Sequence, residues 1–242
     1  MESAAAVIEA LKKCADPIRA AAGGRYFKTG PGQYGEGDLF WGIRVPQQRL
    51  IAKGALGLPL AEVEKLLESP IHELRLTALL ILVYRMRRAD LEAQSDIVAF
   101  YLGHRAYVNN WDLVDTSASH LLGLYYASQP GHQQLYELAR SSNLWDRRIA
   151  IIATFGFLAQ GQFDETLALA EILLTDREDL IQKAVGWALR EVGKRNHDLE
   201  VGFLNKHAAQ MPRTMLRYAL EKFSPAQRKF YLTLGANDAK LP

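Results

Sequence analysis

A tryptophan and an aspartate one helical turn apart are the residues of this chain best suited to chemistry. Trp111 and Asp115 stand in the run Trp-Asp-Leu-Val-Asp, directly after Asn109 and Asn110. Asn110 can cap a helix through its side-chain oxygen, and residues four apart share one face of that helix. The ring can pack on a sugar or a base, and the carboxylate can stabilise developing positive charge. The alternative is a core aromatic beside a solvated acid, the commoner meaning of such a pair.

The helices that must position this pair recur at a regular spacing. Alanines near the middle of five predicted helices are 40, 32, 34 and 35 residues apart, and paired-helix solenoids repeat every ~33 to 47 residues. These alanines are Ala78, Ala118, Ala150, Ala184 and Ala219. The spacing predicts an all-α fold, an α-solenoid of HEAT-like helix pairs that forms one continuous domain over residues 1–242.

Apolar residues at three-and-four spacing predict the individual helices, and no alternating strand pattern of useful length occurs. The predicted helical stretches are Ala5–Ile18, Val63–Leu67, Leu74–Tyr84, Ile97–Leu102, Leu113–Tyr126, Ile149–Leu158, Leu167–Leu174, Ile181–Val192 and Met215–Phe223. Helix starts are predicted at Ser69-Pro70, Asn143, Asp176 and Met211-Pro212.

One segment, residues 28–38, departs from the helical pattern. Its four glycines and one proline exclude a helix. It lacks the Gly-Lys-Ser/Thr ending of a phosphate-binding loop, and no strand precedes it, so we reject a nucleotide site. Two interpretations stay open: a flexible connector, or a mobile flap that carries Lys28 and Tyr34 toward a ligand.

The repeat alanines align four side chains from three successive repeats. Trp111 and Asp115 lie seven and three residues before one alanine, and Trp187 lies three after another, which places them on one side of their helices. Arg148, two residues before its alanine, is turned toward the flank. Equivalent helices of a solenoid line one concave wall, so the four side chains could converge there.

Each of the four residues also has a structural interpretation. Trp187 could be a core aromatic, Arg148 could pair with Asp146, and Asp115 could hold the end of an adjacent helix. All four being purely structural, at this spacing, is less expected than a shared site.

Basic residues are concentrated in parts of the chain although the net charge is only +2. From residue 190 to 229 there are nine bases and four acids. A second cluster comprises Arg85, Arg87, Arg88 and Arg105. Such strips suit a phosphate backbone, whereas the alternative is a solvated helical face.

Composition excludes several other classes of protein. The single cysteine, Cys14, excludes an internal disulfide and fits a reducing cytosol. The N-terminus lacks the features of a signal peptide, and the longest apolar run, Ala78–Tyr84, is too short to span a membrane. The histidines show no metal-ligand spacing, and no Ser-His-Asp or Cys-His arrangement occurs. We expect no metal and no cofactor.

Three motifs resemble those of the AlkD-type DNA alkylation repair glycosylases. They are the run at 111–115, Asn-Leu-Trp-Asp-Arg-Arg-Ile-Ala at 143–150, and Ile-Gln-Lys-Ala-Val-Gly-Trp-Ala-Leu-Arg-Glu at 181–191. The run Phe-Trp-Gly-Ile-Arg-Val-Pro at 40–46 is similar to the family's early helix entry. The resemblance covers roughly residues 25 to 223. It departs from the best-studied branch in a longer glycine-rich segment and in Asp179-Leu180, where that branch has two aromatics.

This resemblance implies a HEAT-like solenoid that grips duplex DNA and removes cationic alkylpurines such as 3-methyladenine and 7-methylguanine, with the base left stacked. Asp115 would be the catalytic carboxylate, Trp111 and Trp187 the aromatic pair around the deoxyribose, and Arg148 a backbone contact. Further expected DNA contacts are Arg147, Lys183, Arg190, Lys194, Tyr26 and Arg217. We expect a monomer in the cytoplasm, associated with the nucleoid in a bacterium. The rival functions are a non-catalytic binder of distorted or branched DNA and a protein-interaction scaffold.

Overall fold

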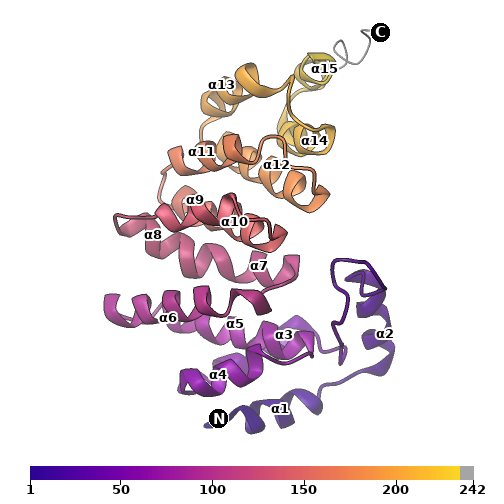
Figure 1. The fold of residues 1–242 in the computed structure, drawn as a ribbon, viewed down its shortest axis with the longest axis vertical. Helices are drawn as coiled ribbons and strands as arrows, with labels where there is room; N and C mark the ends of the chain where they lie inside the picture. The colour runs from indigo at the N-terminus through magenta and orange to yellow at the C-terminus, as the bar shows by residue number, and fades with distance from the viewer. Residues whose placement is uncertain (235–242) are drawn as a thin grey trace. The chain divides into compact units, whose positions relative to one another are not determined.

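The computed structural model describes residues 1–234, and this part of the chain is helical almost from end to end (Figure 1). Within it, the only β-type pairing is a single backbone bridge between Leu39 and Ile71. The predicted all-α class is therefore confirmed. No helix in the described range is both long and apolar enough to cross a membrane. Contacts divide the chain into one unit over Met1–Leu121 and a second that begins at Leu122.

The first unit is organised around one long buried helix, α5. Its helices are α1 (Ala4–Lys12), α2 (Pro17–Tyr26), α3 (Val45–Lys53), α4 (Leu60–Leu67), α5 (His72–Met86), α6 (Leu91–Gly103), the 3₁₀ turn η1 (Arg105–Tyr107) and α7 (Trp111–Ala118). Helix α5 is apolar on nearly every side, which is typical of a helix surrounded by protein. It packs against α3, α4, α6 and α7.

The second unit has two such central helices. Its elements are α8 (Leu124–Ser128), α9 (Gln133–Ala139), α10 (Leu144–Ala159), α11 (Asp164–Ile172), α12 (Asp179–Gly193), α13 (His197–His207), α14 (Arg213–Ala219), η3 (Leu220–Lys222) and α15 (Pro225–Leu234). Helix α10 packs against α8, α9, α11 and α12, and α12 also contacts α13 and α14. Successive helices therefore form the layers of this unit (Figure 1).

The predicted helix Leu113–Tyr126 is interrupted by a π-helical turn. Helix α7 runs into η2 (Ser119–Gly123), which has π geometry, and α8 follows at Leu124. In the second unit, Gly123 lies against Gly156 of α10 so closely that a Cβ on either would meet the backbone of the other. Glycine is required there for this helix approach.

The five repeat alanines are all fully buried, as close helix packing requires. Within each unit, the structure therefore supports the close helix packing that the repeat alanines predict. A HEAT-like repeat over the whole chain, and a single domain over residues 1–242, stay predictions.

Three predicted boundaries are wrong for local reasons. Ala5–Ile18 is not one helix, because α1 ends at Lys12 and the Asp16 carboxylate caps α2 by accepting from the N–H groups of Ile18 and Arg19 at 3.0 and 3.2 Å. Pro17 suits only the first turn of the new helix.

The helix starts predicted at Ser69-Pro70 and Asp176 lie before the observed starts of α5 at His72 and α12 at Asp179. The Ser69 hydroxyl and the Asp176 carboxylate each accept from the N–H two residues later, which forms a turn before α5 and α12. The starts at Asn143 and Met211-Pro212 are confirmed, since α10 begins at Leu144 and α14 at Arg213.

Candidate functional site

Helix α7 begins at Trp111, where the sequence predicts its start. The Asn110 side-chain oxygen accepts from the Trp111 N–H at 2.8 Å, and Asn110 itself is fully buried. The cap is confirmed, and it fixes the position at which the first residues of α7 enter the unit.

Trp111 and Asp115 lie on the wall of one cavity of about 240 Å³ in the first unit. The other lining residues come from α3, α5 and the residue directly after it, α7 and η2: Arg49, Leu80, Val83, Arg87, Asp112, Thr116 and His120. Both residues are partly exposed. An aromatic ring and a carboxylate therefore face one largely polar space, beside two arginines.

A stack of aromatic rings holds Trp111 in place. Its ring stacks on Phe27 with centroids 5.4 Å apart, and Phe27 stacks on Phe40 at 5.2 Å with only 8° between the planes. Tyr26, 65% exposed, meets Trp111 edge-on at 5.9 Å. The predicted DNA contact Tyr26 thus lies beside the predicted catalytic Trp111.

A buried histidine between two carboxylates supports the start of α7, and the sequence analysis missed it. His72 Nδ1 lies 3.0 Å from Asp38 Oδ2, and His72 Nε2 lies 2.8 Å from Asp112 Oδ2. Arg75 donates to the second oxygen of Asp38 at 2.6 Å. We call Asp38, His72 and Asp112 the relay. It joins the end of the glycine-rich segment to the helix that carries Trp111 and Asp115.

The carboxylates of the relay favour the protonated form of His72. Burial disfavours the imidazolium, but hydrogen bonds to Asp112 and Asp38 outweigh burial and raise the pKa of His72. Burial likewise opposes the Asp38 carboxylate, yet the His72 hydrogen bond and the Arg75 charge lower the pKa of Asp38. A protonated His72 between two carboxylates is therefore the favoured form.

The glycine-rich segment 28–38 is non-helical, as predicted. Lys28 adopts a φ of 54°, and its ammonium lies 5.8 Å from the ring centre of Tyr34. The Gly35 N–H donates to the Lys28 carbonyl at 3.1 Å, and Asp38 anchors the end in the relay. Lys28 and Tyr34 therefore interact with each other. Whether the segment acts as a flap stays a prediction.

The second unit carries the other predicted site residues. Trp187 is half-buried and packs edge-on against Phe155, with centroids 4.6 Å apart. Arg148 is 5% exposed and donates to the Leu180 carbonyl at 2.5 Å. Arg147 donates to Asp176 at 2.7 Å. Both arginines thus have clear structural roles, and their convergence with Trp111 and Asp115 stays a prediction.

The remaining basic candidates of the second unit form ion pairs at its surface, with one exception. Lys183 pairs with Asp179 at 2.6 Å, Lys194 with Glu191 at 2.5 Å, and Arg190 with Glu221. Arg217 is exposed. Exposed ion pairs contribute about 0–1 kcal/mol, so Lys183 and Lys194 can exchange their carboxylate for a phosphate at little cost, whereas the Arg190 side chain is only 15% exposed.

Comparison with known proteins gives the family. A family model described as DNA alkylation repair enzyme matches residues 7–223. The chain belongs to the DNA alkylation repair enzyme family. Among solved structures, a predicted DNA alkylation repair enzyme from Enterococcus faecalis has a TM-score of 0.68 and 21% identity, covering 87% of this chain and 97% of its own. No curated protein sequence matches the chain significantly.

Membership of the DNA alkylation repair family supports a role in alkylation repair with DNA as the partner. The similar structure, at 21% identity, supports the fold. Within residues 1–234, no group of three or more His, Cys, Asp or Glu side chains is arranged to hold a metal ion.

Proposed function

We propose that this member of the DNA alkylation repair family is a DNA glycosylase. It hydrolyses the N-glycosidic bond of cationic alkylpurines, of the 3-methyladenine and 7-methylguanine type, in duplex DNA. The observation that carries the proposal is the presence of Trp111 and Asp115 on one cavity wall, on a helix fixed by the Asn110 cap and the relay.

The chemistry follows from the charge of the lesion. A purine alkylated at N3 or N7 is cationic, so the glycosidic electron pair leaves with the base and neutralises it. The sugar is left oxocarbenium-like, and the Asp115 carboxylate stabilises that positive charge. Water then adds to the anomeric carbon and loses its proton to Asp115. No general acid is needed, because the leaving base already carries the charge.

The aromatic residues position the sugar. Trp111, held by Phe27, offers a fixed ring face for the deoxyribose and excludes bulk water. Trp187 and Arg148 are proposed to act from the second unit, Trp187 on the sugar and Arg148 on the backbone. Among the further candidates, Tyr26 and Arg217 are exposed enough to reach DNA directly.

The test is the release of free methylated purines from alkylated duplex DNA by the purified protein. We expect wild-type protein to release them and Asp115→Asn to lose most of this activity while still binding duplex DNA. Asp198→Asn, at an exposed aspartate of α13, is the matched control and should behave as wild type. Binding without release by wild-type protein would favour a non-catalytic DNA binder, and no DNA binding would favour a protein scaffold.

A further inference from the structure

We propose that the cavity beside Asp115 is a phosphate subsite, in which Arg49, Arg87 and His120 hold one phosphate group of the duplex. The proposal rests on the proposed function only in naming DNA as the source of that phosphate. The cavity, its lining and its charges are properties of the first unit alone.

The three side chains reach the cavity from three separate elements. Arg49 lies on α3, Arg87 directly after the end of α5, and His120 on η2. Arg49 makes one long hydrogen bond, at 3.4 Å, to the Tyr84 hydroxyl. Such a bond is weak enough to be exchanged for a charge-assisted bond to phosphate oxygen.

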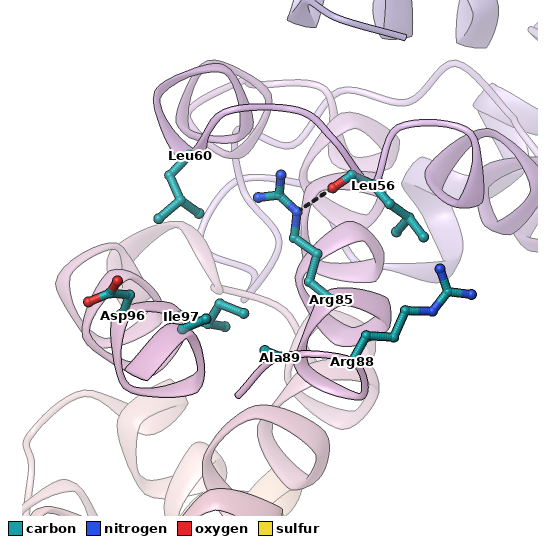
Figure 2. A pocket seen from close by; sticks show the side chains of 8 residues that line it. Leu56, Leu60, Arg85, Arg88, Ala89, Asp96 and Ile97 are labelled. Atoms are coloured by element: carbon teal, nitrogen blue, oxygen red, sulfur yellow. Dashed lines mark hydrogen bonds between the residues drawn. The ribbon is translucent and has the colours of Figure 1, made fainter. Parts of the chain in front are cut away.

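Arg87 differs in position from its neighbours Arg85, in the last turn of α5, and Arg88, which follows the helix. Arg85 donates to the backbone carbonyls of Leu56 and Leu58, the first at 2.7 Å. These bonds attach it to the loop that precedes α4. Figure 2 shows that Arg85 and Arg88 line another pocket, together with Asp96. Of this basic cluster, Arg87 lines the cavity that contains Asp115.

One of the two carboxylates that line the cavity is already paired with His72, so the two arginines outnumber the remaining carboxylate. Arg49 and Arg87 are positive, and Asp115 and Asp112 are the facing carboxylates. Asp112 is already compensated by its bond to His72. Burial, followed by the charges of Arg87 and Arg49, lowers the pKa of His120. His120 therefore lies in a region of positive potential, where a bound phosphate would be stabilised and would favour its protonated form.

His120 lies on the π-helical turn η2, which directly follows the helix that carries Asp115. His120 is five residues after Asp115 and lines the same cavity. Single π turns occur frequently at functional sites, and this one places a phosphate-binding side chain next to a catalytic carboxylate.

The volume of the cavity bears on which part of the DNA it can hold. The cavity measures about 240 Å³, below the ~300–1,000 Å³ of pockets that enclose drug-sized ligands. It is large enough for a phosphodiester group. The phosphate subsite is therefore a positioning site for the backbone, separate from recognition of the alkylated base.

The test follows the titration of His120 by NMR, with His120→Asn identifying its signal among the six histidines. The probes are a 12-base-pair duplex and, separately, inorganic phosphate. We expect the duplex to raise the pKa of His120 by about one pH unit, as an adjacent opposite charge does. Arg87→Gln should abolish this rise. Arg88→Gln, the matched control one residue away, should retain it.

The outcomes separate the subsite from the proposed function. A rise with both probes supports a general phosphate site, and a rise with the duplex alone supports a subsite specific for DNA. A rise in the pKa of His120 without any base excision would support the phosphate subsite and contradict the glycosylase proposal. A pKa of His120 that neither probe changes, or a rise that survives Arg87→Gln, overturns the proposal.

Discussion

Glu200 gives the chain a pH-dependent weakness that one substitution should remove. Its side chain is on α13, only 2% of the residue is exposed, and Oε1 has no hydrogen-bond partner in the described part of the chain. The carboxyl group packs directly against Gly193 at the end of α12. Burial raises the pKa of Glu200 from 4.5 to about 8, although the charge of Arg190 acts in the opposite direction.

The sign and size follow from proton linkage. The folded state keeps its Glu200 proton up to about pH 8, whereas the unfolded chain loses it near pH 4.5. Because the folded state binds more protons in this range, Glu200 lowers the free energy of unfolding by about 1.4 kcal/mol for each pH unit of increase. Over the whole interval the loss amounts to about 5 kcal/mol. Glu200→Gln keeps the shape of the side chain and removes the ionisation.

The assay is urea unfolding of wild-type protein and Glu200→Gln from pH 5 to pH 9. The variant should gain stability relative to wild type as the pH rises, and the gain should level off above about pH 8. Asp198→Asn, at an exposed position on the same helix, should show no such trend. A difference between Glu200→Gln and wild type that is constant across the pH range would refute the reasoning.

Three further outcomes are expected. His72→Asn should lower the free energy of unfolding in urea by about 3–5 kcal/mol, because it removes the cation between Asp38 and Asp112 and leaves Asp38 with Arg75 alone; a loss under 1 kcal/mol would show that the relay is unimportant. Gly156→Ala should destabilise the second unit by at least ~1–3 kcal/mol, since the new Cβ meets the backbone of Gly123. The control Gly202→Ala, with open space around it in α13, should be neutral or stabilising by up to about 1 kcal/mol. Thermal unfolding of the two variants distinguishes these outcomes. Arg148→Ala should weaken binding to duplexes of any sequence and reduce the salt slope of log K by about one; unchanged affinity and slope in fluorescence anisotropy would restrict Arg148 to its bond with Leu180.

Sequence periodicity predicts the long apolar helices well and the short polar ones poorly. Helices α5, α10 and α12 bury most of their residues, so their apolar spacing is clear. Helices α2 and α15 bury none and one of their described residues, respectively, and no apolar pattern marks them. Tertiary packing, and caps such as Asp16, decide where those elements lie.

The candidate site is only partly visible in the sequence. The Asn110 cap and the four-residue spacing place Trp111 and Asp115 together, because both relations are local. The relay is not visible, since His72 is 34 residues from Asp38 and 40 from Asp112. His120 was missed because only the fold brings it to the same cavity as Arg49 and Arg87.

Single-turnover excision from a duplex with one 7-methylguanine tests the central claim most directly. Wild-type protein should release the base, and Asp115→Asn should be slower by about 10²–10³-fold, the usual loss for a preorganised electrostatic group. A matched uracil duplex should release nothing, because a neutral base departs poorly without a general acid. Equal rates for wild type and Asp115→Asn, or efficient release of uracil, would contradict the proposed mechanism.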